Sequence, residues 1–173
     1  MFSANDITLY VPCFRAENTI RQCVDALSSQ YVKPGRLLAI DDGSPKPLAL
    51  PGIEIIRHPV NKGLAAARNT ALHACRTPLI AAVDADVVAD RNWLNVMLET
   101  LNQHVAEGHV SGIGGRLIEH FNLRLADRWR AIHMAQHWGD SRVVNPRFLY
   151  GANTLFIADD VRMADGYDPA LRT

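Results

Sequence analysis

The chain has 173 residues, of which 48% are hydrophobic and 21% are charged. This composition is that of a soluble globular protein and excludes collagen, a coiled coil and an intrinsically disordered chain. Eighteen Lys and Arg residues balance eighteen Asp and Glu residues, so the net charge favours neither nucleic acid nor an anionic membrane. Recognition therefore has to come from local sites, and no nucleic-acid partner is expected.

The cysteines and the amino terminus indicate where the chain works. Cys13, Cys23 and Cys75 are widely spaced and form no C-x-x-C pair, so they predict neither a disulfide framework nor a zinc site. The first residues lack the basic and apolar regions of a leader peptide, and no apolar run reaches the roughly 20 residues that span a bilayer. We expect a single cytoplasmic domain over residues 1–173, with peripheral association with the inner face of a membrane left open.

Strand and helix patterns alternate along the first two thirds of the chain. Apolar and β-branched runs predict buried strands, whereas apolar residues at helical spacing and alanine-rich stretches predict helices. The predicted strands cover residues 7–11, 37–40, 53–56 and 79–83, and the predicted helices cover residues 17–30, 64–75 and 90–107. This order predicts an α/β fold with a mostly parallel sheet and helices on both faces.

The third of these helices allows two detailed predictions. Asp90 is of the type that caps a helix amino terminus. The spacing of the apolar residues predicts that Trp93, Val96, Met97 and Leu101 face the core.

The pattern after residue 110 is less regular and predicts a mixed extension of the same sheet. Glycines at 112, 114 and 115 interrupt a short strand, and residues 148–157 form an apolar strand interrupted at 151–153. Residues 121–138 have the pattern of an amphipathic helix that carries Trp129 and Trp138 near several arginines. These aromatic and basic residues suit an acceptor platform or a membrane interface, but core packing with arginines that extend to solvent is the favoured interpretation.

Two acidic clusters directly follow predicted strands: Asp41 with Asp42, and Asp84 with Asp86. Ligands of parallel α/β sheets bind beyond the carboxyl ends of the strands, so we expect the clusters to face one crevice although they lie about forty residues apart. Mg²⁺ and Mn²⁺ take carboxylate ligands and complete their coordination with phosphate, which implies a phosphorylated ligand. Each cluster alone also fits an ordinary acidic turn or a solvated loop.

A third segment, Asn61 to Asn69, connects a turn to the second predicted helix. Its small residues allow close approach to neighbouring backbone, and Arg68 can direct a fixed cation toward a ligand. The alternative interpretation is a well-formed surface helix.

Five segments together resemble family 2 glycosyltransferases, in order and approximate spacing. They are residues 11–17, 41–44, 61–69, 84–86 and 166–168. The resemblance implies the glycosyltransferase A fold and a nucleotide-diphosphate sugar donor, usually a UDP-sugar. It also implies inversion at the anomeric carbon, a carbohydrate or lipid-linked acceptor, and Mn²⁺ or Mg²⁺ as cofactor.

The resemblance also implies roles for individual residues. Asp86 is the metal ligand proper and the one catalytic assignment, because a cation held there stabilises the departing diphosphate. Asp84 is the first carboxylate of the D-x-D motif, near ribose or metal. The segment 151–153 lies beside the sugar and the acceptor, through Gly151, Ala152 and Asn153. The positions implied for donor binding are Pro12, Glu17, Asp41, Asp42, Asn61, Gly63, Arg68, Asp84 and Ala85.

One expected group is missing from the pattern. An inverting transfer needs a base for the acceptor hydroxyl, and in the resembled family this is an Asp shortly after the Gly-x-Asp segment. Here that segment is Gly166-Tyr167-Asp168, and Asp168-Pro169 is typical of a turn. We expect the base beyond Thr173, and a chain that binds donor better than it transfers sugar.

Three other functions remain as alternatives. The sequence from Leu79 to Val87 also fits the D-x-D-x-V of a haloacid-dehalogenase-like phosphotransferase, although all three lysines precede Asp84. A dinucleotide-binding oxidoreductase is disfavoured because no G-x-G-x-x-G follows the first strand. A non-catalytic nucleotide-binding module is compatible with the missing base.

His133 and His137 are spaced for a zinc site, but no third ligand accompanies them.

Overall fold

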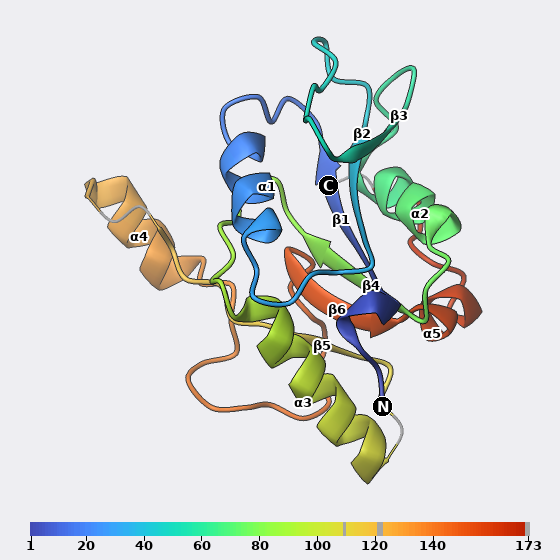
Figure 1. The fold of residues 1–173 in the computed structure, drawn as a ribbon. Helices are drawn as coiled ribbons and strands as arrows, with labels where there is room; N and C mark the ends of the chain where they lie inside the picture. Colours follow the sequence, from blue (N-terminus) through green and yellow to red (C-terminus); the bar gives the residue numbers. More distant parts are fainter. Residues whose placement is uncertain (109, 121–122, 172–173) are drawn as a thin grey trace.

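The computed structural model describes residues 1–108, 110–120 and 123–171 (Figure 1). Six strands form one sheet in the order β3-β2-β1-β4-β6-β5. The first four of these are parallel, whereas β6 is antiparallel to both β4 and β5. The strands are β1 (Ile7–Cys13), β2 (Arg36–Asp41), β3 (Glu54–Arg57), β4 (Leu79–Val83), β5 (Gly112–Gly114) and β6 (Asn153–Ile157).

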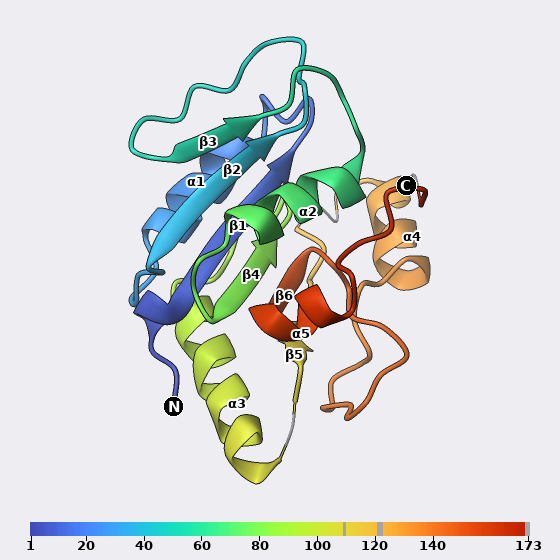
Figure 2. The same ribbon diagram turned by 90° about the vertical axis from the view of Figure 1, so that its right-hand side faces the viewer.

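Helices cover both faces of the sheet, as Figures 1 and 2 show. The described helices are η1 (Ala4–Asp6), α1 (Ile20–Ser28), α2 (Leu64–Ala74), α3 (Trp93–Glu107), α4 (Leu125–His133) and α5 (Ala158–Met163). The apolar faces of α1 and α3 pack on one side of the sheet, while α2 and α5 pack on the other. The predicted mostly parallel α/β architecture is confirmed.

The strand β1 lies at the centre of the sheet, and all seven of its residues are buried. Side chains alternate along a strand, so Leu9 and Val11 face the α1 and α3 layer whereas Tyr10 faces α2. Pro12 is tolerated in this central strand because the pairing with β4 ends at Tyr10. The apolar run at 7–13 therefore reflects a strand covered on both faces.

The helix α3 differs from the prediction in its start and in one inward residue. Val96 is 49% exposed, whereas Leu94, Met97, Leu98 and Leu101 are buried, so the inward face is rotated away from Val96. Asp90 is not the cap, because α3 begins at Trp93.

The side chain that caps α3 comes from the segment directly after α1. Gln30, which follows α1 and is buried, accepts the Leu94 N–H at 2.9 Å through its side-chain oxygen. Its amide also donates to the Asp90 carbonyl at 2.6 Å. The first N–H groups of every helix lack partners within the helix. One of these groups in α3 is thereby bound by a residue 64 positions earlier in the sequence.

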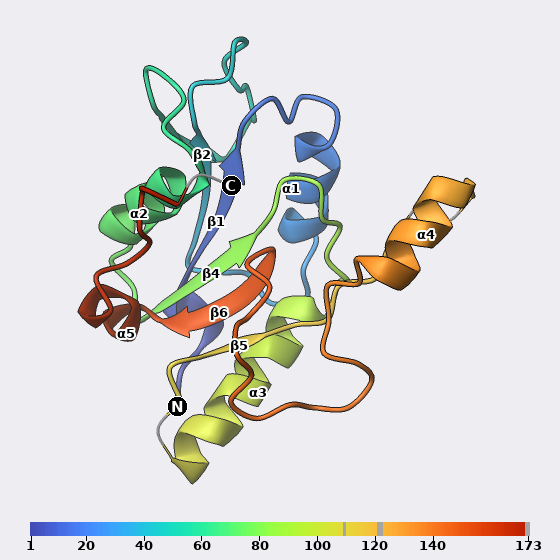
Figure 3. The ribbon, with the colours of Figure 1, turned by 180° about the vertical axis from the view of Figure 1, so that it is seen from behind.

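The segment after β5 departs further from the prediction. Of the helix expected over 121–138, only α4 is helical, and residues 121–122 lie outside the described residues. No residue of α4 is buried, and Trp129 and Trp138 are 58% and 42% exposed, so the predicted core packing is wrong. The predicted strand over 148–157 begins only at Asn153. Figure 3 shows α4 projecting from the body of the molecule.

We predict that Gln30→Leu lowers the free energy of unfolding by about 1 to 3 kcal/mol, because it leaves the Leu94 N–H and the Asp90 carbonyl without this partner. Urea unfolding measures the change. Gln22→Leu on the exposed side of α1 is the matched control. Equal stability of the two variants would contradict the capping role.

Candidate active site

The carboxyl ends of β1, β2 and β4 meet at one edge of the sheet, together with the start of β6. The Asp42 N–H donates to the Cys13 carbonyl at 2.8 Å, and the Asp84 N–H donates to the Ala152 carbonyl at 3.3 Å. Burial raises the pKa of the Cys13 thiol most, and the charges of Cys23, Asp41 and Asp84 add to this effect. The parallel order β2-β1-β4 places the two acidic turns on either side of the end of β1, so the predicted convergence of these turns is observed.

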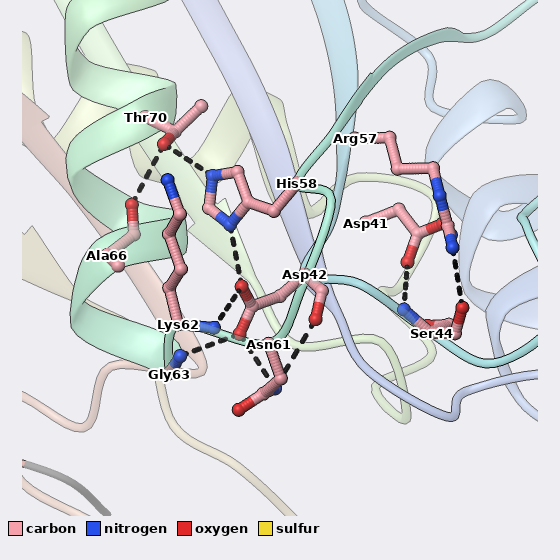
Figure 4. Close-up of polar contacts among 10 residues, drawn as sticks. All are labelled: Asp41, Asp42, Ser44, Arg57, His58, Asn61, Lys62, Gly63, Ala66 and Thr70. Carbon is pink, nitrogen blue, oxygen red and sulfur yellow. Dashed lines mark hydrogen bonds and ion pairs between the residues drawn. The ribbon is translucent and has the colours of Figure 1, made fainter.

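Asp41 is bound by the loop that follows it and by Arg57, and Figure 4 shows it beside Ser44 and Arg57. Its carboxylate, 0% exposed, accepts the Ser44 N–H at 2.9 Å and the Leu48 N–H at 3.3 Å, and forms an ion pair with Arg57. Burial opposes ionisation, but the hydrogen bonds from Ser44, Leu48 and Arg57 outweigh it and lower the Asp41 pKa. In this arrangement Asp41 holds the 44–48 loop.

Asp42 organises the turn that leads into α2 (Figure 4). Its carboxylate accepts the backbone N–H groups of Lys62 and Gly63 at 2.9 and 2.8 Å, and the Asn61 side-chain amide at 2.9 Å. The His58 ring lies 2.6 Å from the same carboxylate. Gly63 supplies the backbone conformation that the turn needs, with φ 93°. This buried carboxylate positions the turn.

A hollow of about 290 Å³ opens beside the Asp42 turn. It lies between the end of β1 and the start of α2, and combines apolar walls with the polar groups of the turn. It is lined by Pro12, Cys13, Phe14, Asp42, Asn61, Gly63, Leu64 and Ala67. Such a mixture of apolar walls and few polar groups suits a small flat ligand.

The D-x-D motif differs from the first acidic pair because its carboxylates remain available. One Asp84 oxygen is buried and has no hydrogen-bond partner among the described residues. Burial raises the Asp84 pKa; Arg68 opposes the shift and the nearby Asp86 adds to it. Asp86 is exposed, whereas Ala85 is buried in the core beneath the turn. The motif thus presents two carboxylates that the protein itself does not saturate.

Arg68 lies within reach of Asp84 and is enclosed by the carboxyl-terminal third of the chain. Its guanidinium is 3.8 Å from the Asp84 carboxylate and 5.4 Å from the centre of the Tyr167 ring. A Cβ on Gly151 would lie 2.3 Å from the guanidinium, so only glycine leaves room for it. The neighbouring Asn69 exchanges two hydrogen bonds with the Tyr167 backbone, at 2.7 and 2.9 Å. Segments far apart in sequence therefore orient the arginine.

The remaining predicted site residues have other surroundings. Glu17 is exposed and is not among the residues that line the hollow. Asn153 is buried, where its side chain accepts the Trp93 indole N–H at 2.7 Å and donates to the Arg116 carbonyl at 3.3 Å. Asn153 therefore joins α3 to the chain after β5, while Gly151 and Ala152 contact the Arg68 and Asp84 side of the site.

Two polar residues to which the sequence did not point support the acidic turns. His58 bridges Asp42 and the Thr70 hydroxyl, at 2.6 and 2.8 Å, and thereby ties the loop after β3 to α2. Arg57 pairs with Asp41 from the end of β3. Both residues lie at the carboxyl end of a parallel strand, which is the signal that could have identified them.

The carboxylates of Asp84 and Asp86 fit a hard divalent cation that phosphate oxygens also coordinate, and the Asp84 oxygen that receives no hydrogen bond from the described residues supports this fit. No group of three or more His, Cys, Asp or Glu that could enclose a metal occurs in the described part of the chain. A protein site with two carboxylates is typical of Mg²⁺ or Mn²⁺ bound together with a phosphorylated ligand.

Residues 8–163 match the model of a protein family described as Glycosyl transferase family 2. The chain belongs to this family. The Pre-mycofactocin glycosyltransferase of Mycobacterium tuberculosis (strain CDC 1551 / Oshkosh) is 34% identical over 123 residues, which is 67% of this chain and 24% of the relative. The Uncharacterized glycosyltransferase EpsJ of Bacillus subtilis (strain 168) is 26% identical over 116 residues, or 62% of this chain and 33% of the relative. The chain thus spans a quarter to a third of these relatives.

Solved structures share the fold. Staphylococcus aureus TarS 1-349 in complex with UDP has a TM-score of 0.68 and 14% identity, over 96% of this chain and 51% of that one. The mannosyltransferase PcManGT from Pyrobaculum calidifontis, in complex with GDP-Man and Mn²⁺, has a TM-score of 0.66 and 16% identity, over 95% of this chain and 48% of that one. The predicted glycosyltransferase A fold is confirmed, and the family match decides against the phosphotransferase and oxidoreductase alternatives. No helix among the described residues is long and apolar enough to cross a membrane.

We predict that Asp84→Asn raises the unfolding temperature at pH 7. Burial chiefly raises the pKa of this carboxyl, so the folded state disfavours its charged form above the folded pKa. The penalty is relieved as the pH falls through the folded pKa toward the ordinary value of 3.8, and the difference between variant and parent should shrink with it. Thermal unfolding between pH 7 and pH 4 measures both effects.

Asp25→Asn on the exposed face of α1 is the control for loss of one charge. An Asp84→Asn variant that is less stable than the parent at pH 7, or a difference that does not change with pH, would show that the carboxylate is not destabilised by its surroundings.

Proposed function

We propose that this domain binds a nucleotide-diphosphate sugar, in the first place a UDP-sugar, and transfers the sugar with inversion to a hydroxyl of a carbohydrate or lipid-linked acceptor. The observation that carries the proposal is the unsaturated Asp84 carboxylate beside the enclosed Arg68, at the same sheet edge as the hollow at Asp42. The family match and the nucleotide complexes of TarS and PcManGT support it.

Different regions of the site would bind different parts of the donor. The hollow with Pro12 and Asp42 suits the nucleoside, since a flat base can pack on its apolar walls while the polar groups of the turn select its edge. Asp41, which its own loop saturates, serves this pocket by shaping it. Asp42 retains its proposed donor contact, because it lines the hollow as well as holding the turn.

Arg68 is placed to bind the diphosphate. A guanidinium forms strong charge-assisted bonds with phosphate oxygens, and Gly151 and Tyr167 restrict the directions it can take. A pre-oriented cation loses little conformational entropy when the ligand binds. The charge of Arg68 also remains close to Asp84, so a bound diphosphate and cation would balance the charges of both residues.

Asp86 and Asp84 would hold Mn²⁺ or Mg²⁺. When bound, the cation offsets the negative charge that develops on the departing diphosphate. The exposed Asp86 is accessible to such a ligand, and the partly buried Asp84 has an oxygen to offer.

The acceptor base is not supplied by Asp168. Its carboxylate accepts the Ala170 N–H at 2.8 Å and forms the predicted turn.

We predict that UDP binds at least about tenfold more tightly with Mn²⁺ than with EDTA, and that Asp86→Ala abolishes this difference. Calorimetric titration with UDP, GDP and ADP, each with Mn²⁺ and with EDTA, measures the metal dependence and identifies the preferred nucleobase. Asp25→Ala is the control, because its side chain is exposed on α1 away from the D-x-D motif. In assays of sugar transfer, Asp86→Ala should cost about 3 kcal/mol of transition-state stabilisation. Metal dependence that persists in Asp86→Ala would remove the metal role of this residue.

We predict that Gly151→Ala weakens UDP binding about tenfold and leaves uridine binding unchanged, because the three atoms nearest to the added Cβ all belong to the Arg68 guanidinium, which it would displace. Titrations with uridine and UDP separate the two contributions. In the control Gly108→Ala, the added Cβ meets no atom within 4 Å. An equal loss for uridine and UDP would indicate a general distortion of the site.

A further inference from the structure

The helix α4 exposes its apolar face. Leu125, Trp129 and Ile132 are spaced four and three residues apart, so they share one face, and they are 84%, 58% and 73% exposed. None of the nine residues of α4 is buried. Figures 1 and 3 show the helix standing away from the sheet. This apolar face therefore contributes nothing to the core.

Exposed apolar side chains continue on both sides of the helix. Leu123 precedes it and Met134 follows it, and both are largely exposed. A contiguous patch of this kind on a monomer marks an interaction surface, whereas single exposed apolar residues do not. We call Leu123, Leu125, Trp129, Ile132 and Met134 the α4 patch.

The segment around the α4 patch is basic although the whole chain is neutral. Residues 116–147 contain six of the eighteen basic residues but only three of the eighteen acidic ones. The three carboxylates already have partners: Glu119 pairs with Arg130, Asp140 pairs with Arg116, and Asp127 accepts the Arg124 N–H at the start of α4. The segment therefore combines an apolar helical face with an excess of positive charge.

This combination favours one occupant. An in-plane helix with Trp and Leu on one face and arginines beside it is typical of binding to an anionic bilayer surface. A second copy of the chain suits the patch less well, because it would bring two like-charged segments together. At 1.5 Å per residue, a nine-residue helix is much shorter than the hydrocarbon core and can only lie in the interface.

We propose that α4 is a membrane-docking helix that binds this domain to an anionic phospholipid surface through the α4 patch. The assignment stands apart from the donor site, because none of the residues of the patch lines the hollow or contacts the D-x-D motif. It specifies the surface of contact, whereas the acceptor proposal concerns only the chemical class of the hydroxyl.

Co-sedimentation with vesicles tests the proposal. The chain is mixed with vesicles of phosphatidylcholine alone or with about one third phosphatidylglycerol. Binding is expected to the anionic vesicles and should weaken at high salt, because the electrostatic contribution is screened. The triple variant Leu125→Ser, Trp129→Ser, Ile132→Ser should lose at least about tenfold in partition coefficient, since binding scales with the buried apolar area.

Two controls make the result specific. The double variant Ala126→Ser, Ala131→Ser changes α4 away from the apolar stripe and should bind vesicles like the parent. The triple variant should keep the unfolding temperature and the UDP affinity of the parent, because no residue of α4 belongs to the core. If neither the parent nor any variant binds UDP, the proposed function is contradicted, whereas the membrane-docking proposal is unaffected.

Three outcomes would overturn the docking role. They are absence of binding to anionic vesicles, equal binding by the parent and the triple variant, and a dimer in lipid-free solution that the triple variant dissociates. The last outcome, measured by light scattering, would assign the α4 patch to a second copy of the chain.

Discussion

The parallel pairing of β1 with β2 on one side and β4 on the other is the constraint on which the site depends. Parallel strands end at the same edge, so the turns after β2 and β4 lie on either side of the end of β1. The antiparallel strand β6 then starts at this same edge and brings Gly151 and Ala152 to the D-x-D turn. A charged ligand site is thereby assembled from segments more than one hundred residues apart.

The two acidic turns use their carboxylates in opposite ways. Asp41 and Asp42 are buried and accept hydrogen bonds from the loops that they organise, which stabilises their charges internally. Asp84 has a buried oxygen that receives no hydrogen bond from the described residues and faces Arg68 at 3.8 Å, and burial raises its pKa, so its charge is stabilised incompletely. Unsatisfied buried charge is unfavourable for the empty protein and favourable for binding a ligand that completes it. The first pair thus builds the pocket, and the second is available to the ligand.

Much of the fold could be predicted because the apolar patterns are strong. The runs at 7–11 and 79–83 are strands because a central parallel strand is covered on both faces. The errors occur where long-range contacts override local preference. Asp90 is a good cap by type, yet Gln30, which follows α1, binds the Leu94 N–H. The aromatic and basic residues near α4 resemble a core helix in pattern, yet no element of the described structure covers them.

The sequence by itself determined the α/β class, the resemblance to family 2 glycosyltransferases and the acidic turns, because these follow from local periodicity and from residue types at fixed spacing. Only the tertiary structure decided which carboxylates remain available, what orients Arg68 and which face of α4 is exposed. Each of these depends on burial and on partners from distant segments, such as Arg57 for Asp41 or Tyr167 for Arg68. Local sequence does not specify such contacts, because they form only when the folded sheet brings distant segments together.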